Sequence, residues 1–190
     1  MKRNVVAVIG DGAMTAGMAF EALNNAGAAK VPMCVVLNDN GMSIAPSVGA
    51  LTNYLKDLTS RRALLSDAEL EASLAALQAP AGPVSEGATW FEQFGFRYIG
   101  PVDGHNVLQL VKVMQAVRAA PGPVLVHIIT EKGKGHPFAA PHAENYHAVD
   151  RFDLDQSSVD LPVADALQSG EAFFPGFDCP FGRARRADHD

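Results

Sequence analysis

Cysteines and long apolar runs are both scarce in this sequence. Its 190 residues include only two cysteines, Cys34 and Cys179, which lie far apart and form no CxxC-type pair. The sequence therefore excludes a disulfide framework, and we expect a cytoplasmic protein in which Cys34 is a small buried apolar residue. The apolar run at residues 5–9 is too short for a signal peptide or a membrane span. No other uncharged run approaches spanning length, so no association with a membrane is expected.

An excess of basic charge is also lacking. Lys and Arg number 15 against 21 Asp and Glu, which gives a formal net charge of -6. Binding to nucleic acid requires clustered cations, so this balance argues against a nucleic-acid partner. The one small basic cluster, at Arg183, Arg185 and Arg186, is interpreted as a solvated end. A length of 190 residues, with 48% hydrophobic and 19% charged residues, indicates one globular domain.

Near its beginning, the sequence alternates between strand and helix patterns. Residues 5–9 form a continuous apolar run that is typical of a strand buried on both faces, and residues 33–37 form another. Residues 13–26 between them are rich in Ala, Met, Glu and Leu, which favours a helix, and Gly27 is interpreted as its stop. Strand, helix and strand with short connections predict a parallel sheet with flanking helices, and therefore an α/β fold.

Two further helices are predicted in the middle of the chain. Ser66 and Glu69 have the spacing of a capping box ahead of one helix, and Asn106 is the predicted cap of the next. The apolar face expected for the second helix consists of Val107, Leu110, Val111, Met114 and Val117.

The remaining segments complete the predicted organisation. Residues 96–99 and 124–129 are predicted strands, and residues 79–87 are a predicted loop. The partial domain is assigned to residues 1–153. Residues 154–190 are rich in Ser, Asp, Pro and Gly and are expected to form a poorly ordered tail.

Two polar loops follow the first two predicted strands. Gly10-Asp11-Gly12 comes directly after one strand, and Asn38-Asp39-Asn40 comes directly after the other. Open α/β sheets bind ligands at the carboxyl ends of their parallel strands. If these two strands are neighbours, Asp11 and Asn40 can converge on one point.

The residue types in these loops suit a hard cation that bridges a diphosphate. Mg²⁺ prefers octahedral oxygen ligands, of which protein carboxylates usually supply one or two. Asp11 would supply a carboxylate, Asn40 its amide oxygen and Met42 a backbone carbonyl. Gly10 and Gly12 would let the backbone come close to the diphosphate.

The nearest alternative site is one for a dinucleotide. The glycine spacing, Gly10-x-Gly12-x-x-x-x-Gly17, differs from the G-x-G-x-x-G pattern of such sites. The carboxylate of Asp11 would also repel a pyrophosphate unless a cation intervened. The helix start expected near Ala13 would offer free N–H groups to diphosphate oxygens. Either loop alone is usually just a turn, and only their combination points to cation-bridged diphosphate binding.

The same loops carry a resemblance to a known family. Gly10-Asp11-Gly12 followed by Asn38-Asp39-Asn40 resembles the thiamine-diphosphate (ThDP) motif of transketolase-like enzymes. The wider sequence, over about residues 4–153, resembles 1-deoxy-D-xylulose-5-phosphate synthase in particular. The resembling stretches are residues 9–24, 37–44, 48–51, 94–105, 122–135 and 146–149. The resemblance implies the family's ThDP-binding α/β fold.

The resemblance also implies an activity and its ligands. The family condenses pyruvate with glyceraldehyde 3-phosphate, releases carbon dioxide, and uses ThDP and Mg²⁺. Its product feeds isoprenoid, thiamine and pyridoxal synthesis. Asp11, Asn40 and the Met42 carbonyl would hold Mg²⁺, while Gly12 and Ala13, together with Asn40, would contact ThDP.

Four histidines are interpreted one by one. By resemblance, His147 lies in the active site, where it could transfer a proton. His136 stands where the family commonly has a tyrosine near the cofactor, and it is kept as a cofactor contact. His105 follows a turn at Asp103-Gly104 and is interpreted as structural, and His127 is interpreted as a buried histidine with satisfied hydrogen bonds.

By resemblance, the chain covers only part of the family's first domain. This chain has no counterpart of the family segment that precedes this part, and none of the family's second domain. That second domain carries the glutamate that activates the aminopyrimidine of ThDP. The chain is therefore expected to supply a Mg²⁺-diphosphate half-site, to be inactive alone, and to act as a homodimer or with a partner chain. The alternatives are one subunit of a split transketolase-like enzyme, a non-catalytic fragment or interaction module, and a nicotinamide oxidoreductase, which the glycine spacing disfavours.

Overall fold

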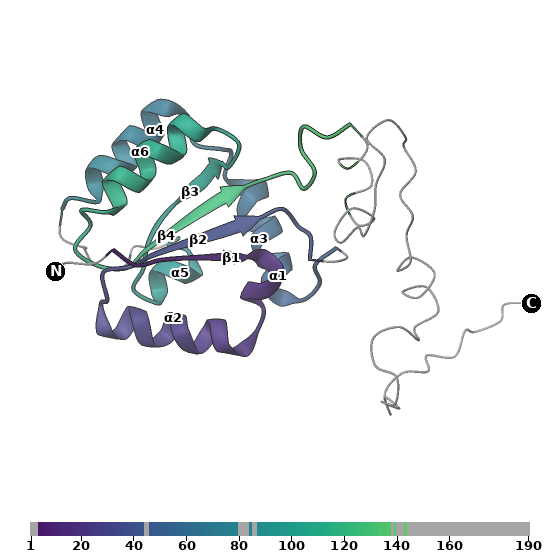
Figure 1. The fold of residues 1–190 in the computed structure, drawn as a ribbon. Coiled ribbons are helices and arrows are strands. Elements are labelled where there is room, and N and C mark those ends of the chain that lie inside the picture. Colours follow the sequence, from purple (N-terminus) through teal and green to yellow (C-terminus); the bar gives the residue numbers. More distant parts are fainter. Residues whose placement is uncertain are drawn as a thin grey trace, which may run out of the picture. The chain divides into compact units, whose positions relative to one another are not determined.

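The computed structural model describes residues 4–43, 46–79, 84, 87–137, 139 and 143 (Figure 1). The chain divides into two units, Met1–Lys134 and Gly135–Asp190, and the fold below belongs to the first. In chain order the described elements are β1 (Val6–Gly10), α1 (Asp11–Met14), α2 (Gly17–Ala29), β2 (Cys34–Asp39), α3 (Ala50–Arg61), α4 (Asp67–Ala76), α5 (Trp90–Gln93), β3 (Arg97–Asp103), α6 (Val107–Val117) and β4 (Val124–Ile129).

The four described strands form one parallel sheet in the order β1-β2-β4-β3. Gly10 is in register with Asn38, and Asp39 is in register with Ile129. The strands therefore end at nearly the same level, and the loops that follow them share one edge of the sheet. This arrangement confirms the predicted α/β fold with a parallel sheet and flanking helices.

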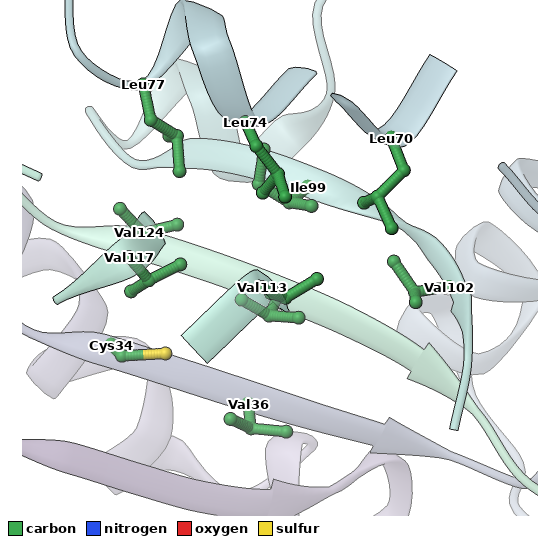
Figure 2. Packing of buried hydrophobic residues seen from close by; sticks show 11 residues of the cluster. Cys34, Val36, Leu70, Leu74, Leu77, Ile99, Val102, Val113, Val117 and Val124 are labelled. Atoms are coloured by element: carbon green, nitrogen blue, oxygen red, sulfur yellow. The ribbon is translucent and has the colours of Figure 1, made fainter. Parts of the chain in front are cut away.

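Helices cover both faces of the sheet. Helices α4 and α6 lie on one face, and α2 and α5 lie on the other (Figure 1). Alternate residues of the central strands enter the two cores because successive side chains of a strand point to opposite faces. Cys34 and Val36 of β2 pack with the α4 and α6 side chains (Figure 2), whereas Val35 and Leu37 pack on the opposite face.

Strand β1 is not buried on both faces, which corrects the prediction for residues 5–9. It is the edge strand of the described sheet, and its Val6 and Val8 side chains are 54% and 72% exposed. Val6 and Val8 are in register with Cys34 and Val36, so they point to the face that carries α4 and α6. Those two helices cover the other strands and leave this part of the face open.

The single helix predicted over residues 13–26 is in fact two helices. The short α1 begins at Asp11, the chain becomes extended at Ala16, and α2 follows. The Thr15 hydroxyl donates to the Gly12 carbonyl at 2.7 Å, a local bond that competes with helix continuation. Gly27 is not the stop, because α2 continues to Ala29 and ends with Lys30 in the left-handed region.

The predicted caps are confirmed, and one predicted helix face needs correction. Ser66 forms a capping box with Glu69 at the start of α4, and Asn106 accepts from the Gln109 N–H at the start of α6. In α6 the most buried side chains are Val113 and Val117. The expected apolar face omitted Val113 and included two residues that the sheet and α4 do not reach, namely Val107 (67% exposed) and Val111 (47% exposed).

Three further comparisons with the sequence analysis concern the tail, two helices and a membrane span. Residues 154–190, predicted to be a poorly ordered tail, lie outside the described residues. Helices α3 and α5 were not predicted, although Thr89 and Glu92 form a capping box that marks the start of α5 in the sequence. None of the described helices is long and apolar enough to cross a membrane.

Candidate functional site: a cation and diphosphate half-site

The two polar loops of the sequence lie side by side at the carboxyl edge of the sheet. Strands β1 and β2 are hydrogen-bonded neighbours, and Gly10 is in register with Asn38. The condition under which Asp11 and Asn40 converge is therefore met. This edge is also the place where parallel α/β sheets bind their ligands.

Asp11 is a buried carboxylate with one engaged oxygen and one unengaged oxygen. The residue is only 4% exposed and is the first residue of α1. Its Oδ2 accepts a hydrogen bond from the Ser47 hydroxyl at 2.9 Å. Its Oδ1 is buried and has no hydrogen-bond partner among the described residues. A buried carboxylate oxygen without a partner is costly, and a bound cation would remove that cost.

Ser47 connects Asp11 to the loop that follows β2. Besides its bond to Asp11, it donates its backbone N–H to the Gly41 carbonyl at 3.1 Å. The loop also closes on itself through an antiparallel bridge between Met42 and Pro46. These contacts bring the loop after Asn40 against the Asp11 carboxylate.

Gly12 lies directly beneath this loop. A Cβ atom at Gly12 would lie 2.9 Å from the Ser43 Cβ and 3.2 Å from the Ser43 Oγ, closer than such atoms normally approach. The sequence predicted that Gly12 lets the backbone come close to a diphosphate. The structure adds that it also lets the loop after β2 come close to α1. Gly10 has no such constraint, since the nearest atom to its Cβ position is 4.0 Å away, and Ala13 is exposed on α1.

The other two predicted cation ligands lie in one tight turn. The Asn40 Oδ1 accepts from the Met42 N–H at 3.0 Å, which is the bond of an Asx turn. An amide oxygen has two lone pairs, so this bond leaves one acceptor position on Asn40. Asn40 and Met42 are both half-buried beside the Asp11 loop.

The remaining two residues of Asn38-Asp39-Asn40 are tied to β4 and the residue after it. The Asn38 Oδ1 accepts from the Thr130 hydroxyl at 2.6 Å, and the Thr130 N–H donates to the Asp39 carbonyl at 2.9 Å. The Asp39 Oδ1 accepts from the Gly41 N–H at 3.2 Å, and the Asp39 Oδ2 lies 3.0 Å from the His127 Nε2. Of the three polar residues, only Asn40 makes no such bond to β4 or Thr130.

His127 is the fully buried partner in this arrangement, and both of its ring nitrogens are engaged. Its Nε2 faces Asp39, and its Nδ1 lies 2.8 Å from the Tyr98 hydroxyl. Burial raises the pKa of Tyr98 well above its usual range, so its hydroxyl keeps a proton to donate. The Arg62 guanidinium carbon lies 5.7 Å from the centre of the Tyr98 ring. The interpretation of His127 as a buried histidine with satisfied hydrogen bonds is confirmed.

The other three histidines differ in what the structure says of them. His105 is structural, as predicted: its N–H donates to Asp103, and its Nε2 accepts from the Glu131 N–H at 2.8 Å. His136 belongs to the second unit, where its Nδ1 accepts from the Ala139 N–H at 3.1 Å. His147 lies outside the described residues.

The donor set fits Mg²⁺ better than a softer metal. No group of three or more His, Cys, Asp or Glu side chains gathers in the part of the chain that the structure describes. The candidate ligands are one carboxylate, one amide oxygen and a backbone carbonyl, which are all hard oxygen donors. Of the two side-chain ligands proposed, Asp11 offers a buried oxygen, Oδ1, with no hydrogen-bond partner among the described residues.

Sequence reasoning did not find Ser47, Thr130 or the role of His127. Ser47 and Asp11 are 36 residues apart, and His127 and Asp39 are 88 residues apart. No local pattern marks such contacts. A polar residue in the middle of a buried strand was the available signal for His127, because such a group requires partners.

Comparison with known protein families identifies the family of this chain. A family model described as 1-deoxy-D-xylulose-5-phosphate synthase matches residues 1–130. The match contains both polar loops, the Ser47 contact and His127, and it ends before His136 and His147. Because it spans more than half of the 190 residues, the chain belongs to the 1-deoxy-D-xylulose-5-phosphate synthase family.

Proposed function

We propose that this chain binds the diphosphate of ThDP through Mg²⁺, as the cation half-site of a 1-deoxy-D-xylulose-5-phosphate synthase reaction. The observation that carries this proposal is the Asp11 Oδ1, which is buried and unpartnered at the carboxyl edge of the sheet. Family membership supports it, because the family uses ThDP and Mg²⁺. The substrates are pyruvate and glyceraldehyde 3-phosphate.

The metal ligands proposed from this chain are Asp11, Asn40 and the Met42 carbonyl. Phosphate oxygens and water would complete the octahedral shell, as is usual for Mg²⁺. Gly10, Gly12 and Ala13 would bring backbone close to the diphosphate. Helix α1 has only four residues, so the few peptide dipoles that it aligns attract an anion weakly. The cation is therefore the main attraction for the diphosphate.

ThDP, when bound, supplies the nucleophilic carbon and the electron sink that decarboxylation of pyruvate requires. The part of this chain is to hold and orient the cofactor. His136 is proposed as a cofactor contact and His147 as a group that transfers protons, both on the strength of the resemblance.

We propose that the chain does not catalyse the reaction alone. The residues assigned at the sheet edge hold the cation and the diphosphate, which form one end of the cofactor. Groups that activate the aminopyrimidine are not among them. A second candidate function, one subunit of a split transketolase-like enzyme, is favoured by the open edge at β1, where Val6 and Val8 are exposed. A homodimer would serve the same purpose.

The test is a calorimetric titration of the purified chain with ThDP, with and without Mg²⁺. Asp11→Asn should abolish the Mg²⁺-dependent binding, because a neutral amide replaces the carboxylate ligand. Asp103→Asn is the matched control, since Asp103 ends β3 at the same edge but is assigned no ligand role. Absence of binding by folded wild-type chain at millimolar ThDP would leave the interpretation as a non-catalytic fragment or interaction module. Turnover only after a second chain is added would establish the split enzyme.

A further inference from the structure

We infer that the hydrogen-bonded series Tyr98–His127–Asp39 positions the turn that presents Asn40 to Mg²⁺, an inference that rests on the proposed function. His127 is thus assigned as a positioning residue, acting through Asp39 and not through contact with the cofactor.

The hydrogen bonds in this series run in one direction, from Tyr98 to Asp39. A carboxylate only accepts hydrogen bonds, so His127 carries its proton on Nε2 and donates it to the Asp39 Oδ2 at 3.0 Å. The Nδ1 is then the acceptor, and the Tyr98 hydroxyl donates to it at 2.8 Å. This order fixes the tautomer of the imidazole, because an unprotonated Nε2 would place two acceptors, Nε2 and the Asp39 carboxylate, face to face.

The hydrogen-bonded series ends at the turn that contains Asn40. With its Oδ2 held by His127, the Asp39 carboxylate offers Oδ1 to the Gly41 N–H at 3.2 Å. Gly41 has φ +67, a left-handed conformation that this bond helps to maintain. Asn40 lies between these two residues, so the orientation of its side chain follows from the position of Asp39.

The surroundings make the His127 end rigid. The histidine is fully buried, and the Asp39 side chain is 13% exposed. Gly100 of β3 packs against the His127 backbone so closely that a Cβ there would lie 2.6 Å from the His127 carbonyl oxygen. A fixed donor that holds the residue next to a ligand is the arrangement that orients metal ligands in other metal sites.

Two substitutions at His127 separate positioning from bulk stability. In Gln the amide nitrogen can take the place of Nε2, so His127→Gln keeps a donor to Asp39 and loses the acceptor for Tyr98. In Asn the amide oxygen can take the place of Nδ1, so His127→Asn keeps the acceptor for Tyr98 and loses the donor to Asp39. Both introduce a polar amide into the same buried site, and a merely structural role would make them equally harmful.

The first readout is the Mg²⁺ concentration that half-saturates ThDP binding to the full chain. His127→Asn should raise it by about tenfold or more, the usual cost of losing a group that orients a metal ligand, and His127→Gln should stay within about threefold of wild type. Equal effects of the two variants, or wild-type behaviour of His127→Asn, would overturn the inference. If His127→Asn does not fold, Asp39→Ala breaks the same contact at a less buried position, and wild-type binding by that variant would overturn it equally.

The second readout does not need the cofactor. Amide hydrogen exchange measured by NMR should accelerate at Gly41 in His127→Asn, while the amide of His105 stays unchanged. His105 is the matched control because its N–H donates to the Asp103 carboxylate in a similar turn, at 2.9 Å, that His127 does not reach. Unchanged exchange at Gly41 would overturn the inference even if ThDP binds. Failure of the wild-type chain to bind ThDP would instead overturn the proposed function, and with it the presentation of Asn40.

Discussion

Ser47 donates its hydroxyl to Asp11 at 2.9 Å and thereby joins the loop after β2 to the residue that follows β1. Both residues are buried, Ser47 at 8% and Asp11 at 4% exposure. The bond occupies one carboxylate oxygen and leaves the other, Oδ1, for a ligand. The orientation of the carboxylate at the proposed cation site is therefore set by a side chain from a different loop.

Replacing Ser47 tests this relationship directly. Ser47→Ala should raise the Mg²⁺ concentration needed for half-saturating ThDP binding by about tenfold, because the Asp11 carboxylate loses the group that orients it. The free energy of unfolding should fall by about 1–3 kcal/mol, since a second buried oxygen is left without a donor. Ser60→Ala is the control, because Ser60 is an exposed α3 residue that bonds only its own helix. Wild-type Mg²⁺ dependence of Ser47→Ala would contradict the assignment.

The close approach of Gly12 to the loop predicts a strained Gly12→Ala variant. The new Cβ would lie 2.9 Å from the Ser43 Cβ, so the loop must move, and we expect a loss of about 1–3 kcal/mol in unfolding free energy together with weaker ThDP binding.

Ser43→Gly should rescue much of this loss. Without the Ser43 side chain, the nearest side-chain atom around the new Cβ is the Ser47 Oγ at 3.4 Å. Urea unfolding of the two single variants and the double variant gives the coupling energy. Additive effects would show that the Gly12 and Ser43 positions do not interact.

Two glycines of helix α2 should respond oppositely to alanine. A Cβ at Gly27 would lie 1.7 Å from the Phe94 carbonyl oxygen, so Gly27→Ala must push the backbone after α5 away from α2. We expect a loss of about 3 kcal/mol. Gly17→Ala meets nothing within 4 Å and should be neutral or stabilising by about 0.5 kcal/mol. Thermal unfolding of both variants checks the prediction, and similar melting temperatures would refute it.

The buried thiol of Cys34 predicts a loss of stability at alkaline pH. Burial raises the pKa of Cys34 from 9.0 to about 11. Between these values the unfolded chain has released the thiol proton and the folded chain still holds it, so the free energy of unfolding falls as the pH rises from 9 towards 11. Cys34→Val removes the titrating group while keeping an apolar side chain of similar size. Urea unfolding at several pH values from 8 to about 10 should show wild type losing stability relative to the variant, whereas parallel curves would contradict this account.

Much of the fold could be predicted because its signals are local. β4 spans the residues predicted, 124–129, because a run that is apolar except for His127 follows a Pro-Gly-Pro stop. The caps at Ser66 and Asn106 act over three residues, and the structure has both. The burial of β1 was predicted wrongly because an apolar run shows that a strand can be covered, not which elements cover it.

The candidate site also has a part that local sequence signals predict and a part that they do not. Asp11 and Asn40 could be singled out because each follows a strand directly, and a parallel register then brings them to one edge. The Ser47 hydroxyl, the Thr130 hydroxyl and the His127 ring reach that edge from distant parts of the chain. Their contacts depend on the strand order β1-β2-β4-β3, in which β4, late in the sequence, lies next to β2.

The attachment of the Asn38-Asp39-Asn40 turn to β4 and Thr130 has a consequence for how this sequence can change over evolution. Asp39 pairs with His127, and Asn38 pairs with Thr130, across 88 and 92 residues. A change in either member of a pair leaves a partly buried polar atom of the other without its partner. Across related chains we therefore expect position 39 to vary together with 127, and position 38 with 130, while position 40 is constrained by its own turn and by the proposed cation.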